Sequence, residues 1–466
     1  MATRKVLKIT PILIALNLLV LFLMVVFYSV RMVKYYLKEN GNRKTDDVVL
    51  LVDTLKKKQS YLDETKGLVL NEETGVYTYK GDVTDNYIQY SGMTFRIMSI
   101  DKEGNMKAVS EENVTLLYPG LNNGYEKSIV NKWLNISEEK YSGVYESALY
   151  KPDTIITNGS YCNDVIDDVS NITCDNVLTD YKITLLSLYD YKMAGGKDSY
   201  LNNGDIFYLG TLNKDNSNYY VTDEGEIALN EKESKAITVK PVITFDHTNE
   251  LVSGKGTEED PYIIEKHKVK TLADAYVSNI VKINDVNYKI IEILEDKVKL
   301  TSTEPLMKND ELYETKFGGS TSAYKESNTV GTYLNNTYLK SLDVKDYVVR
   351  SNYYIETLSL ANLDYASLRN SKVKASVGML TIGDMFINET TNTFTLLRGM
   401  EAPNMINVLN ENGNLFADTI TAKYNVRPAF YLKGEIEIVS GNGTEEDPYE
   451  LGVNNEGNET SKETEG

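Results

Sequence analysis

The apolar residues of the chain begin as one uninterrupted run. Residues 9–30 carry no charged side chain, and 22 residues at about 1.5 Å each are long enough to span the ~30 Å hydrocarbon core of a membrane. The stretch that follows, "FYSVRMVKYY", is bulky and basic rather than a small-residue cleavage site. The pattern predicts an uncleaved signal anchor at 9–30, with residues 1–8 in the cytoplasm. The alternative is a cleaved signal peptide.

Apolar positions at helical spacing continue after this run. Val48, Leu51, Val52, Leu55 and Leu62 fall on one helical face. This spacing predicts a short helical stalk within residues 31–70, which would allow a homodimer through a coiled coil. The equal alternative is a helix folded back on the first domain.

From about Val76 the pattern changes to short β-rich runs broken by Gly, Asn and Asp. Helical spacing is rare there; one instance is "SIVNKWLNI", which places Val130, Trp133 and Leu134 on one face. Strand-like alternation returns in "EIEIVSGNG" near the end of the chain. These patterns predict an α+β fold.

One phrase occurs twice in this β-rich region. "SGKGTEEDPYII" begins at Ser253 and "SGNGTEEDPYEL" at Ser440, 187 residues later. The same offset places "VKPVITF" at Val239 on "VRPAFYL" at Val426. Because the offset holds over some fifty residues, we infer a tandem duplication with repeats at 71–266 and 267–453. Two long repeats indicate two globular domains rather than a solenoid. The polar tail, 454–466, is expected to be disordered.

Charge and cysteine content narrow the class of protein. The net charge of −19 argues against nucleic acid as a partner, since phosphates require a basic surface. Cys162 and Cys174 are the only cysteines, and both lie in one short polar loop. This placement suits a disulfide in an oxidising compartment; the alternative is two free thiols. Basic residues flank both sides of the apolar run, so charge does not orient it. Since long domains translocate largely regardless of charge, we expect a single-pass cell-membrane protein with its N-terminus inside and its bulk outside.

The string "KITLLSLYDYKMAGG" from Lys182, followed by "VKPVITF" and the repeated phrase, resembles a domain found in surface proteins of Gram-positive bacteria. That domain is in turn similar to the formylglycine-generating-enzyme branch of the C-type lectin fold. The loop "YCND…C" from Tyr161 matches a cysteine loop of the surface domain. The resemblance covers about four fifths of the chain and implies two tandem lectin-like domains. The second repeat lacks the cysteines and the Ala-Gly-Gly of the first.

The enzymes of this fold place paired cysteines late in the domain or use a histidine cluster for iron, and this chain matches neither pattern. Its only histidines are His247 and His267, both near a repeat boundary. The carboxylates of each "GTEEDPY" phrase are better explained as a solvated turn before proline than as a calcium site. No catalytic, metal or cofactor residue is therefore predicted, and we expect no enzyme.

Binding residues concentrate on loops carried by rigid strands. The loops at 200–220 and 388–407 occupy equivalent positions in the two repeats and differ most in content. They supply the candidate ligand-binding residues: Tyr208, Tyr219, Tyr220, Arg398 and Asn404. A structural role is expected for Trp133, Asp190, Lys240, Asp384 and Arg427, with Lys240 or Arg427 meeting a buried carboxylate such as Asp190 or Asp384.

The leading hypothesis is a surface-anchored binding or adhesion protein for a glycan or a protein. The alternatives are an extracytoplasmic enzyme, hydrolytic or oxidative, and an envelope spacer without a ligand. The first repeat is expected to keep the binding geometry, because Gly195 and Gly196 permit a tight helix exit there. The second repeat would leave its helix differently, through Asn388.

Overall fold

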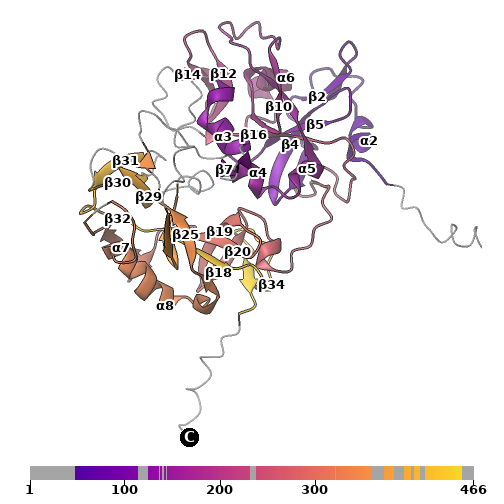
Figure 1. Cartoon of the computed structure of the whole chain (residues 1–466). Helices are drawn as coiled ribbons and strands as arrows, with labels where there is room; N and C mark the ends of the chain where they lie inside the picture. The colour runs from indigo at the N-terminus through magenta and orange to yellow at the C-terminus, as the bar shows by residue number, and fades with distance from the viewer. Residues whose placement is uncertain are drawn as a thin grey trace, which may run out of the picture. The chain divides into compact units, whose positions relative to one another are not determined.

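A computed structural model describes residues 48–113, 124–135, 137–138, 141–142, 144–230, 238–320, 322–355, 357–358, 372–381, 393–399, 404–409 and 415–453. One compact unit begins at Leu50. Within these residues no helix is both long and apolar enough to cross a membrane. The predicted anchor at 9–30 and the tail at 454–466 lie outside the described residues. The described chain consists mainly of β-sheets with short helices (Figure 1).

The first repeat is built on a nine-stranded sheet. Its strands are β1 (Gly67–Asn71), β2 (Val76–Lys80), β3 (Tyr87–Tyr90), β4 (Met93–Ile100), β5 (Met106–Ser110), β8 (Ile156–Thr157), β11 (Ile183–Leu185), β16 (Pro241–Phe245) and β17 (Tyr262–Ile263). All five residues of β5 and of β16 are buried. These two paired strands therefore lie at the centre of the first hydrophobic core.

Smaller sheets and short helices complete the first repeat. A four-stranded sheet contains β12 (Phe207–Leu212), β13 (Asn218–Val221), β14 (Ile227–Asn230) and β15 (Thr238–Val239). Two hairpins pair β9 (Gly159–Cys162) with β10 (Val177–Tyr181), and β6 (Ser137–Glu138) with β7 (Tyr141–Ser142). The helices are α2 (Leu51–Lys56), α3 (Ile129–Asn135), α4 (Val144–Ala148), α5 (Pro152–Ile155) and α6 (Leu188–Ala194).

The second repeat has its own eight-stranded sheet and its own core. The strands are β18 (Ile280–Ile283), β19 (Val286–Ile293), β20 (Lys297–Ser302), β24 (Val348–Val349), β28 (Val377–Met379), β33 (Pro428–Lys433), β34 (Ile438–Ser440) and β35 (Tyr449–Leu451). A six-stranded sheet contains β23 (Glu314–Lys316), β26 (Thr357–Leu358), β29 (Thr393–Gly399), β30 (Met405–Leu409), β31 (Leu415–Thr419) and β32 (Lys423–Asn425). Two hairpins pair β21 (Met307–Lys308) with β22 (Glu311–Leu312) and β25 (Ser351–Tyr354) with β27 (Lys372–Ala375). The helices α7 (Thr329–Thr332) and α8 (Leu339–Ser341) are joined by the π-helical segment η5 (Tyr333–Tyr338), and η4 (Leu272–Asp274) and η6 (Lys345–Tyr347) are short 3-10 helices.

The central strand pairings of the two repeats correspond. In the first repeat β3, β4, β5 and β16 pair in that order, and both β8 and β11 pair with β16. In the second, β18, β19, β20 and β33 pair in the same order, and both β24 and β28 pair with β33. In the smaller sheets, β12 pairs with β13 antiparallel and with β15 parallel, and β29 pairs in the same way with β30 and β32. β29 has β26 as a second parallel neighbour. The duplication inferred from the sequence is thus also a duplication of topology.

The repeated phrase forms the closing loop of each repeat. In the first copy, the N–H groups of Lys255 and Gly256 both donate to the carbonyl of Asp260, at 2.9 Å. The carbonyl of Gly256 accepts from the N–H of Tyr87, which begins β3. The chain then enters β17, which lies parallel to β3. The loop therefore fixes the last strand of the repeat beside the first strand of the duplicated unit.

The second copy repeats these bonds. The matching groups are Asn442 N and Gly443 N donating to Asp447 O, and Ile280 N donating to Gly443 O. β35 then lies parallel to β18. The acidic residues of each "GTEEDPY" phrase therefore lie in a structural turn that these backbone hydrogen bonds close. This agrees with the solvated turn expected before each proline.

A tyrosine and an asparagine join helix to sheet in the same way in both repeats. The Tyr125 hydroxyl donates to the carbonyl of Ile183 in β11, and the Asn135 amide bonds both the N–H and the carbonyl of Ile183. In the second repeat the same bonds join Tyr324, Asn335 and Val377. The sequence "WLN" from Trp133 and the sequence "YLN" from Tyr333 thus place the same asparagine in the same bonds, although their aromatic residues differ.

The predicted stalk is wrong for its described part. α2 has six residues and contributes Leu51, Val52 and Leu55 to the first hydrophobic core. The N–H of Leu51 donates to the carbonyl of Asn249, which anchors the helix to the repeat. Leu62 is fully exposed and lies outside any helix. The helix is therefore folded back on the first domain, and this domain begins near Leu50 rather than at Asn71.

The helix exit expected in the first repeat is present. α6 begins at a capping box of Ser187 and Asp190 and ends at Gly195. Gly195 and Gly196 have φ values of +116° and +61°, which glycine adopts without steric cost. The equivalent exit in the second repeat, including Asn388, lies outside the described residues.

Candidate functional site

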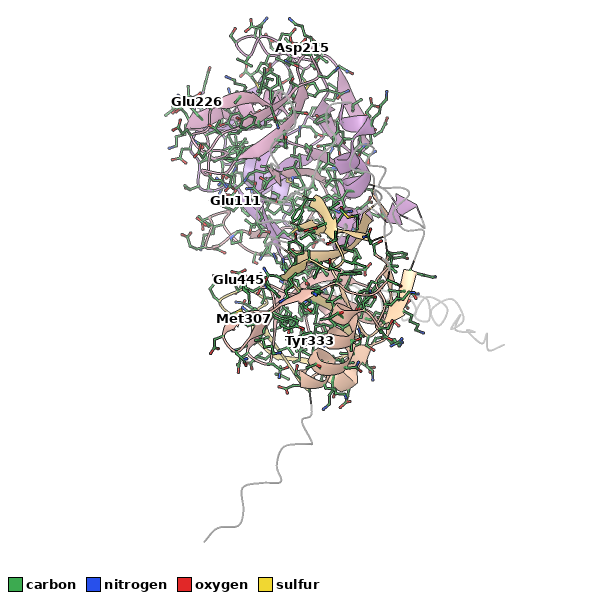
Figure 2. All side chains as sticks on the ribbon, turned by 90° about the vertical axis from the view of Figure 1, so that its left-hand side faces the viewer. Glu111, Asp215, Glu226, Met307, Tyr333 and Glu445 are labelled. Atoms are coloured by element: carbon green, nitrogen blue, oxygen red, sulfur yellow. A yellow bond between two sulfur atoms is a disulfide. The ribbon has the colours of Figure 1, made fainter. Side chains whose placement is uncertain are left out.

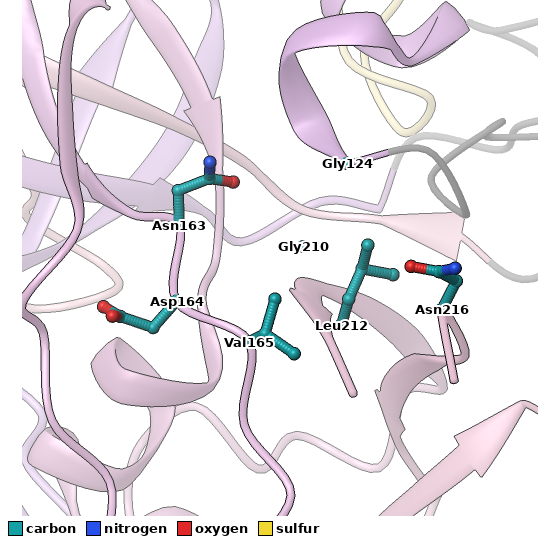
Figure 3. Close-up of a pocket in the computed structure, with 7 residues that line it drawn as sticks. All are labelled: Gly124, Asn163, Asp164, Val165, Gly210, Leu212 and Asn216. Atoms are coloured by element: carbon teal, nitrogen blue, oxygen red, sulfur yellow. The ribbon is translucent and has the colours of Figure 1, made fainter. Parts of the chain in front are cut away.

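A cavity of about 300 Å³ lies in the first repeat beside the disulfide loop. The described residues that line it come from three segments: Gly124; Asn163, Asp164 and Val165; and Gly210, Leu212 and Asn216. Figure 3 shows Val165 and Leu212 near Gly210 in the middle, with Asn163 and Asp164 on one side and Asn216 on the other. The cavity therefore combines the cysteine loop with the loop at 200–220 expected to bind.

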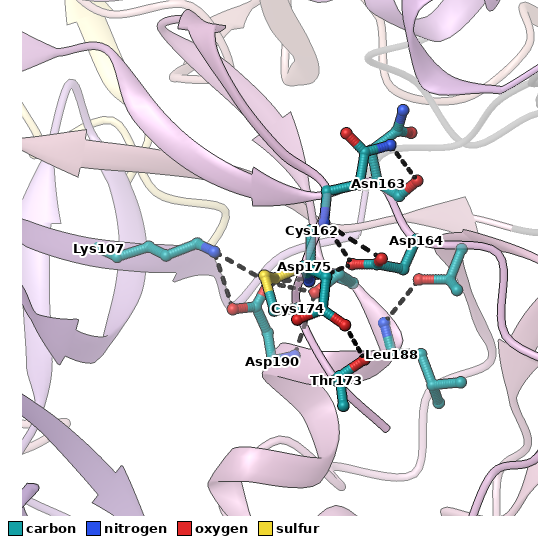
Figure 4. Close-up of a disulfide and its surroundings, with 12 residues drawn as sticks. Lys107, Cys162, Asn163, Asp164, Thr173, Cys174, Asp175, Leu188 and Asp190 are labelled. Atoms are coloured by element: carbon teal, nitrogen blue, oxygen red, sulfur yellow. Dashed lines mark hydrogen bonds and ion pairs between the residues drawn. A yellow bond between two sulfur atoms is a disulfide. The ribbon is translucent and has the colours of Figure 1, made fainter. Parts of the chain in front are cut away.

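The first wall of the cavity consists of Asn163, Asp164 and Val165, and the disulfide and one carboxylate hold it in place. Cys162 and Cys174 form a disulfide that closes a loop with a sequence separation of 12. Asp164 accepts hydrogen bonds from the backbone N–H groups of Asp175 and Asn176 across the loop (Figure 4). The Asp164 carboxylate oxygens therefore accept hydrogen bonds from the protein's own backbone. Its role in the cavity is to position the neighbouring residues Asn163 and Val165.

The second wall is the hairpin of β12 and β13. The Asn213 side chain accepts from the N–H groups of Asp215 and Ser217, which closes the turn. Asn216 then adopts a φ of +58°, a conformation that asparagine tolerates better than most residues. Gly210 has no room for a side chain, because an added Cβ would lie 2.3 Å from the Tyr161 hydroxyl. The hairpin and the cysteine loop meet where the N–H of Ile166 donates to the carbonyl of Leu212.

The lining of the cavity is apolar in its middle and amide-rich at its sides. None of the described lining residues carries a positive charge. The loops around it are acidic overall, with Asp167, Asp168 and Asp215 on their surfaces and a single lysine, Lys214, 3.7 Å from Asp167. An anionic ligand would be repelled there, whereas a neutral ligand with an apolar face and hydroxyl groups matches this lining.

Two of the predicted ligand-binding tyrosines belong to the core. Tyr208 is fully buried and accepts from the Asn230 amide. Tyr219 is 3% exposed, and its hydroxyl donates to the carbonyl of Ile166 at 2.8 Å. The prediction that these two rings face a ligand is therefore wrong. Tyr219 acts instead behind the cavity, by joining β13 to the cysteine loop.

The other candidates lie in different places. Tyr220 is half-buried in β13. Asn404 is exposed, and its carbonyl accepts from the N–H of Ile420. Arg398 lies in β29, where the structure describes its backbone. None of the three lines the cavity among its described residues.

The expected partner of Lys240 is also wrong. Asp190 pairs with Lys107 of β5 at 2.8 Å (Figure 4). Lys240 is 3% exposed, donates to the Glu111 carbonyl at 2.8 Å and lies 3.4 Å from Asp205. Burial lowers the pKa of its ammonium group, against the charges of Glu111 and Asp205.

Lys240 belongs to a network of charged side chains that does not line the cavity among its described residues. Arg96 lies with its guanidinium 3.8 Å from the centre of the Tyr87 ring and 3.7 Å from a Glu111 carboxylate oxygen. In Figure 2, Glu111 and Asp215 lie at different ends of the first repeat. The network contacts the start of β12, where the Lys240 ammonium lies 5.2 Å from the centre of the Phe207 ring, and it has a structural role outside the cavity lining.

The remaining structural candidates can be placed as follows. Trp133 is fully buried in α3, 5.6 Å from the Tyr145 ring. Arg427 is 2% exposed and donates through two nitrogens to the carbonyl of Ser302. Asp384 lies outside the described residues.

Metal-binding side chains do not gather anywhere in the described chain. No group of three or more His, Cys, Asp or Glu residues there is arranged to hold an ion. His247 lies against Asn105, and the His267 ring bonds the Asp274 carbonyl.

Sequence reasoning missed the residues of the first wall, Asn163, Asp164 and Val165. The signal for them was present, because they directly follow Cys162 in the loop that the spacing marked as disulfide-bonded.

The chain matches no protein-family model, and neither the curated proteins nor the solved structures contain a significant match to it.

Proposed function

We propose that this chain is a membrane-anchored extracellular binding protein with two divergent lectin-like repeats, and that the first repeat binds a glycan at the cavity beside the disulfide. The observation that carries the proposal is the lining of that cavity. Val165 and Leu212 offer an apolar surface for the C–H face of a sugar ring, and the amides of Asn163 and Asn216 offer hydrogen bonds to its hydroxyls.

Two further features support an extracytoplasmic site. The Cys162–Cys174 disulfide is typical of oxidising compartments. The uncharged run at 9–30 supplies an anchor of suitable length. Protease treatment of intact cells should then remove both repeats, whereas protection until the membrane is permeabilised would contradict this orientation.

The binding test uses the full chain, kept in a sugar-free detergent so that the detergent cannot compete, on an array of glycans. Val165→Trp fills the cavity from a side chain that is 60% exposed. Val286→Trp is the matched control, since Val286 is 41% exposed in the second repeat. We expect glycan binding that Val165→Trp abolishes and Val286→Trp leaves unchanged.

Other outcomes reject the proposal in distinct ways. Glycan binding that survives Val165→Trp places the site elsewhere. A silent array with a protein captured through the same cavity makes the ligand a protein. Turnover of a bound glycan makes the chain an enzyme. A silent array without a captured partner or turnover leaves an envelope spacer.

A further inference from the structure

One buried side chain near the cavity has no bonding partner. Asn218, the first residue of β13, is 0% exposed. Both its amide nitrogen and its amide oxygen lack a hydrogen bond in the described structure. A buried polar atom without a partner costs about 1–3 kcal/mol, so a fold that keeps two such atoms in one amide calls for an explanation.

Three other buried polar residues of this sheet, one in β12, one in the turn to β13 and one in β14, have hydrogen-bond partners. The Thr211 hydroxyl accepts from the N–H of Leu188, and the Asn213 oxygen closes its turn. The Asn230 amide, directly opposite Asn218 in the ladder, donates to the Tyr208 hydroxyl. Among these buried polar residues, Asn218 is therefore the one whose side chain has no hydrogen-bond partner.

The position of Asn218 links it to the cavity. Its other cross-strand partner is Leu212, which lines the cavity, and directly paired residues present their side chains on the same face of a sheet. Asn216, two residues earlier, also lines the cavity. The buried Asn218 amide thus lies beside the Leu212 side chain, next to the cavity wall.

Resting on the proposed function, we propose that the Asn218 amide determines the specificity of the glycan site for a neutral sugar, by exchanging hydrogen bonds with its ring hydroxyls once Leu212 moves aside. A primary amide has a donor and an acceptor side by side, and neighbouring hydroxyls can serve as acceptor and donor in return. A site built to bond a hydroxyl rejects an analogue that lacks it, because its own polar groups then stay unpaired.

The second repeat lacks this group. The constant offset of 187 residues places Val221, the last residue of β13, on Val408 near the end of β30. At the same offset Asn218 corresponds to Met405. Met405 pairs with Thr419 where Asn218 pairs with Asn230. We therefore expect one sugar site of this kind per chain, in the first repeat.

The first test needs no ligand. Asn218→Leu replaces an unpartnered amide with an apolar group of similar size, and Asn230→Leu removes an amide that has a partner. Thermal unfolding of the full chain should show an unchanged or higher Tm for Asn218→Leu and a lower Tm for Asn230→Leu. An equal loss in both variants would overturn the inference, because Asn218 would then be satisfied in the free protein by a buried water.

The second test uses calorimetric titration with methyl glucoside, methyl galactoside and methyl mannoside, and with the monodeoxy analogues of the sugar that binds. Asn218→Leu should weaken binding of the parent sugar about ten-fold, the equivalent of one lost hydrogen bond. One deoxy analogue should bind wild type equally weakly and bind Asn218→Leu without further loss, since the pair removes a single interaction.

The outcomes separate the inference from the function on which it rests. If wild type binds a sugar that Val165→Trp blocks and Asn218→Leu binds it equally well, the inference is overturned and the glycan site stands. If no sugar binds wild type, both are overturned. Should Asn218→Leu fail to fold, Asn218→Ala gives the same binding comparison.

Discussion

The closing loops depend on single positions where no side chain fits. Gly256 has a φ of +87°, and an added Cβ would lie 2.3 Å from the Tyr262 ring and 2.6 Å from the Asp85 carbonyl. A left-handed conformation alone costs a non-glycine residue about 1–2 kcal/mol, and overpacking adds about 1–3 kcal/mol.

We therefore predict that Gly256→Ala lowers the unfolding free energy of the first repeat by about 2–5 kcal/mol. Gly204→Ala is the control, because Gly204 has a φ of +86° with no atom within 4 Å of an added Cβ. It should show only the conformational part, about 1–2 kcal/mol. Chemical denaturation measures both, and equal losses would mean that the loop relaxes around the new methyl group.

Glu265 gives a residue-scale prediction about pH. Burial raises the pKa of its carboxyl above the ordinary 4.5, although the N–H of Ser91 donates to one of its oxygens at 2.9 Å. The folded state therefore binds this proton more tightly than the unfolded state. The resulting stability is present below pH 4.5 and is lost as pH rises through the raised pKa.

Glu265→Gln removes this loss and keeps an oxygen for Ser91. The stability of the variant relative to wild type should rise as pH increases above 4.5 and then level off. Denaturation midpoints across this range measure it. A flat difference between Glu265→Gln and wild type across this range would refute the argument.

At the same scale, the sequence predicts contacts less well than it predicts loops. The Tyr-rich strand β13 suggested exposed rings, yet Tyr219 is buried and Tyr220 half-buried. Alternation divides a strand into two faces, but it does not say what covers each face. Lys240 shows the same limit, because its partner Asp205 is set by how distant strands pack.

Among the elements, α2 shows how a short amphipathic segment is used. Leu51, Val52 and Leu55 lie on one face of a helix as their spacing predicts, whereas Val48 and Leu62 lie outside it. The choice between a stalk and a folded-back helix depends on Asn249 and the core around it. Since those partners lie far along the chain, the local pattern could not decide.

Leu55→Ala tests the folded-back helix. Leu55 is fully buried, so its truncation should cost about 2–5 kcal/mol. Val48→Ala, at a residue 62% exposed, should change stability by less than about 0.5 kcal/mol. Similar small effects of both in thermal unfolding would return α2 to the role of a stalk.

The disulfide loop is the element whose loss should reach the cavity. Reduction opens a 12-residue separation and removes about 3 kcal/mol or less of stability. It also frees the segment that carries Asn163 and Val165. We expect reductant to lower both the Tm and glycan affinity of wild type, but to change neither in Cys162→Ser/Cys174→Ser. Full affinity after reduction would show that the Asp164 bonds hold the wall alone.

At the scale of the whole molecule, duplication was the part of the fold most open to prediction. The repeated phrase marked the end of each repeat because its bonds need the same residues at the same spacing, such as Gly256 and Gly443. The hairpin β1–β2, which has no counterpart in the second repeat, left no such mark.

The Tyr–Asn locks allow the two repeats to be compared directly. Tyr125→Phe and Tyr324→Phe each remove a hydroxyl that donates a hydrogen bond to a strand carbonyl. Each substitution should lower the unfolding free energy by about 1–2 kcal/mol. Among the described residues, the second core cluster contains no residue of the first repeat, and the first cluster contains only Ile291, Leu380 and Leu409 from the second. Calorimetry should therefore show two unfolding transitions, with each variant lowering a different one. A single transition lowered by both would show that the repeats unfold together.

The parallel pairing of β17 with β3, and of β35 with β18, also has a consequence for biogenesis. Each main sheet joins the earliest and latest strands of its unit, so no unit can finish folding until its last residues have emerged from the ribosome or the translocon. The first unit can close while the second is still being made. Nascent chains halted just before Tyr262 should remain protease-sensitive throughout the first unit, and chains halted well after it should become resistant.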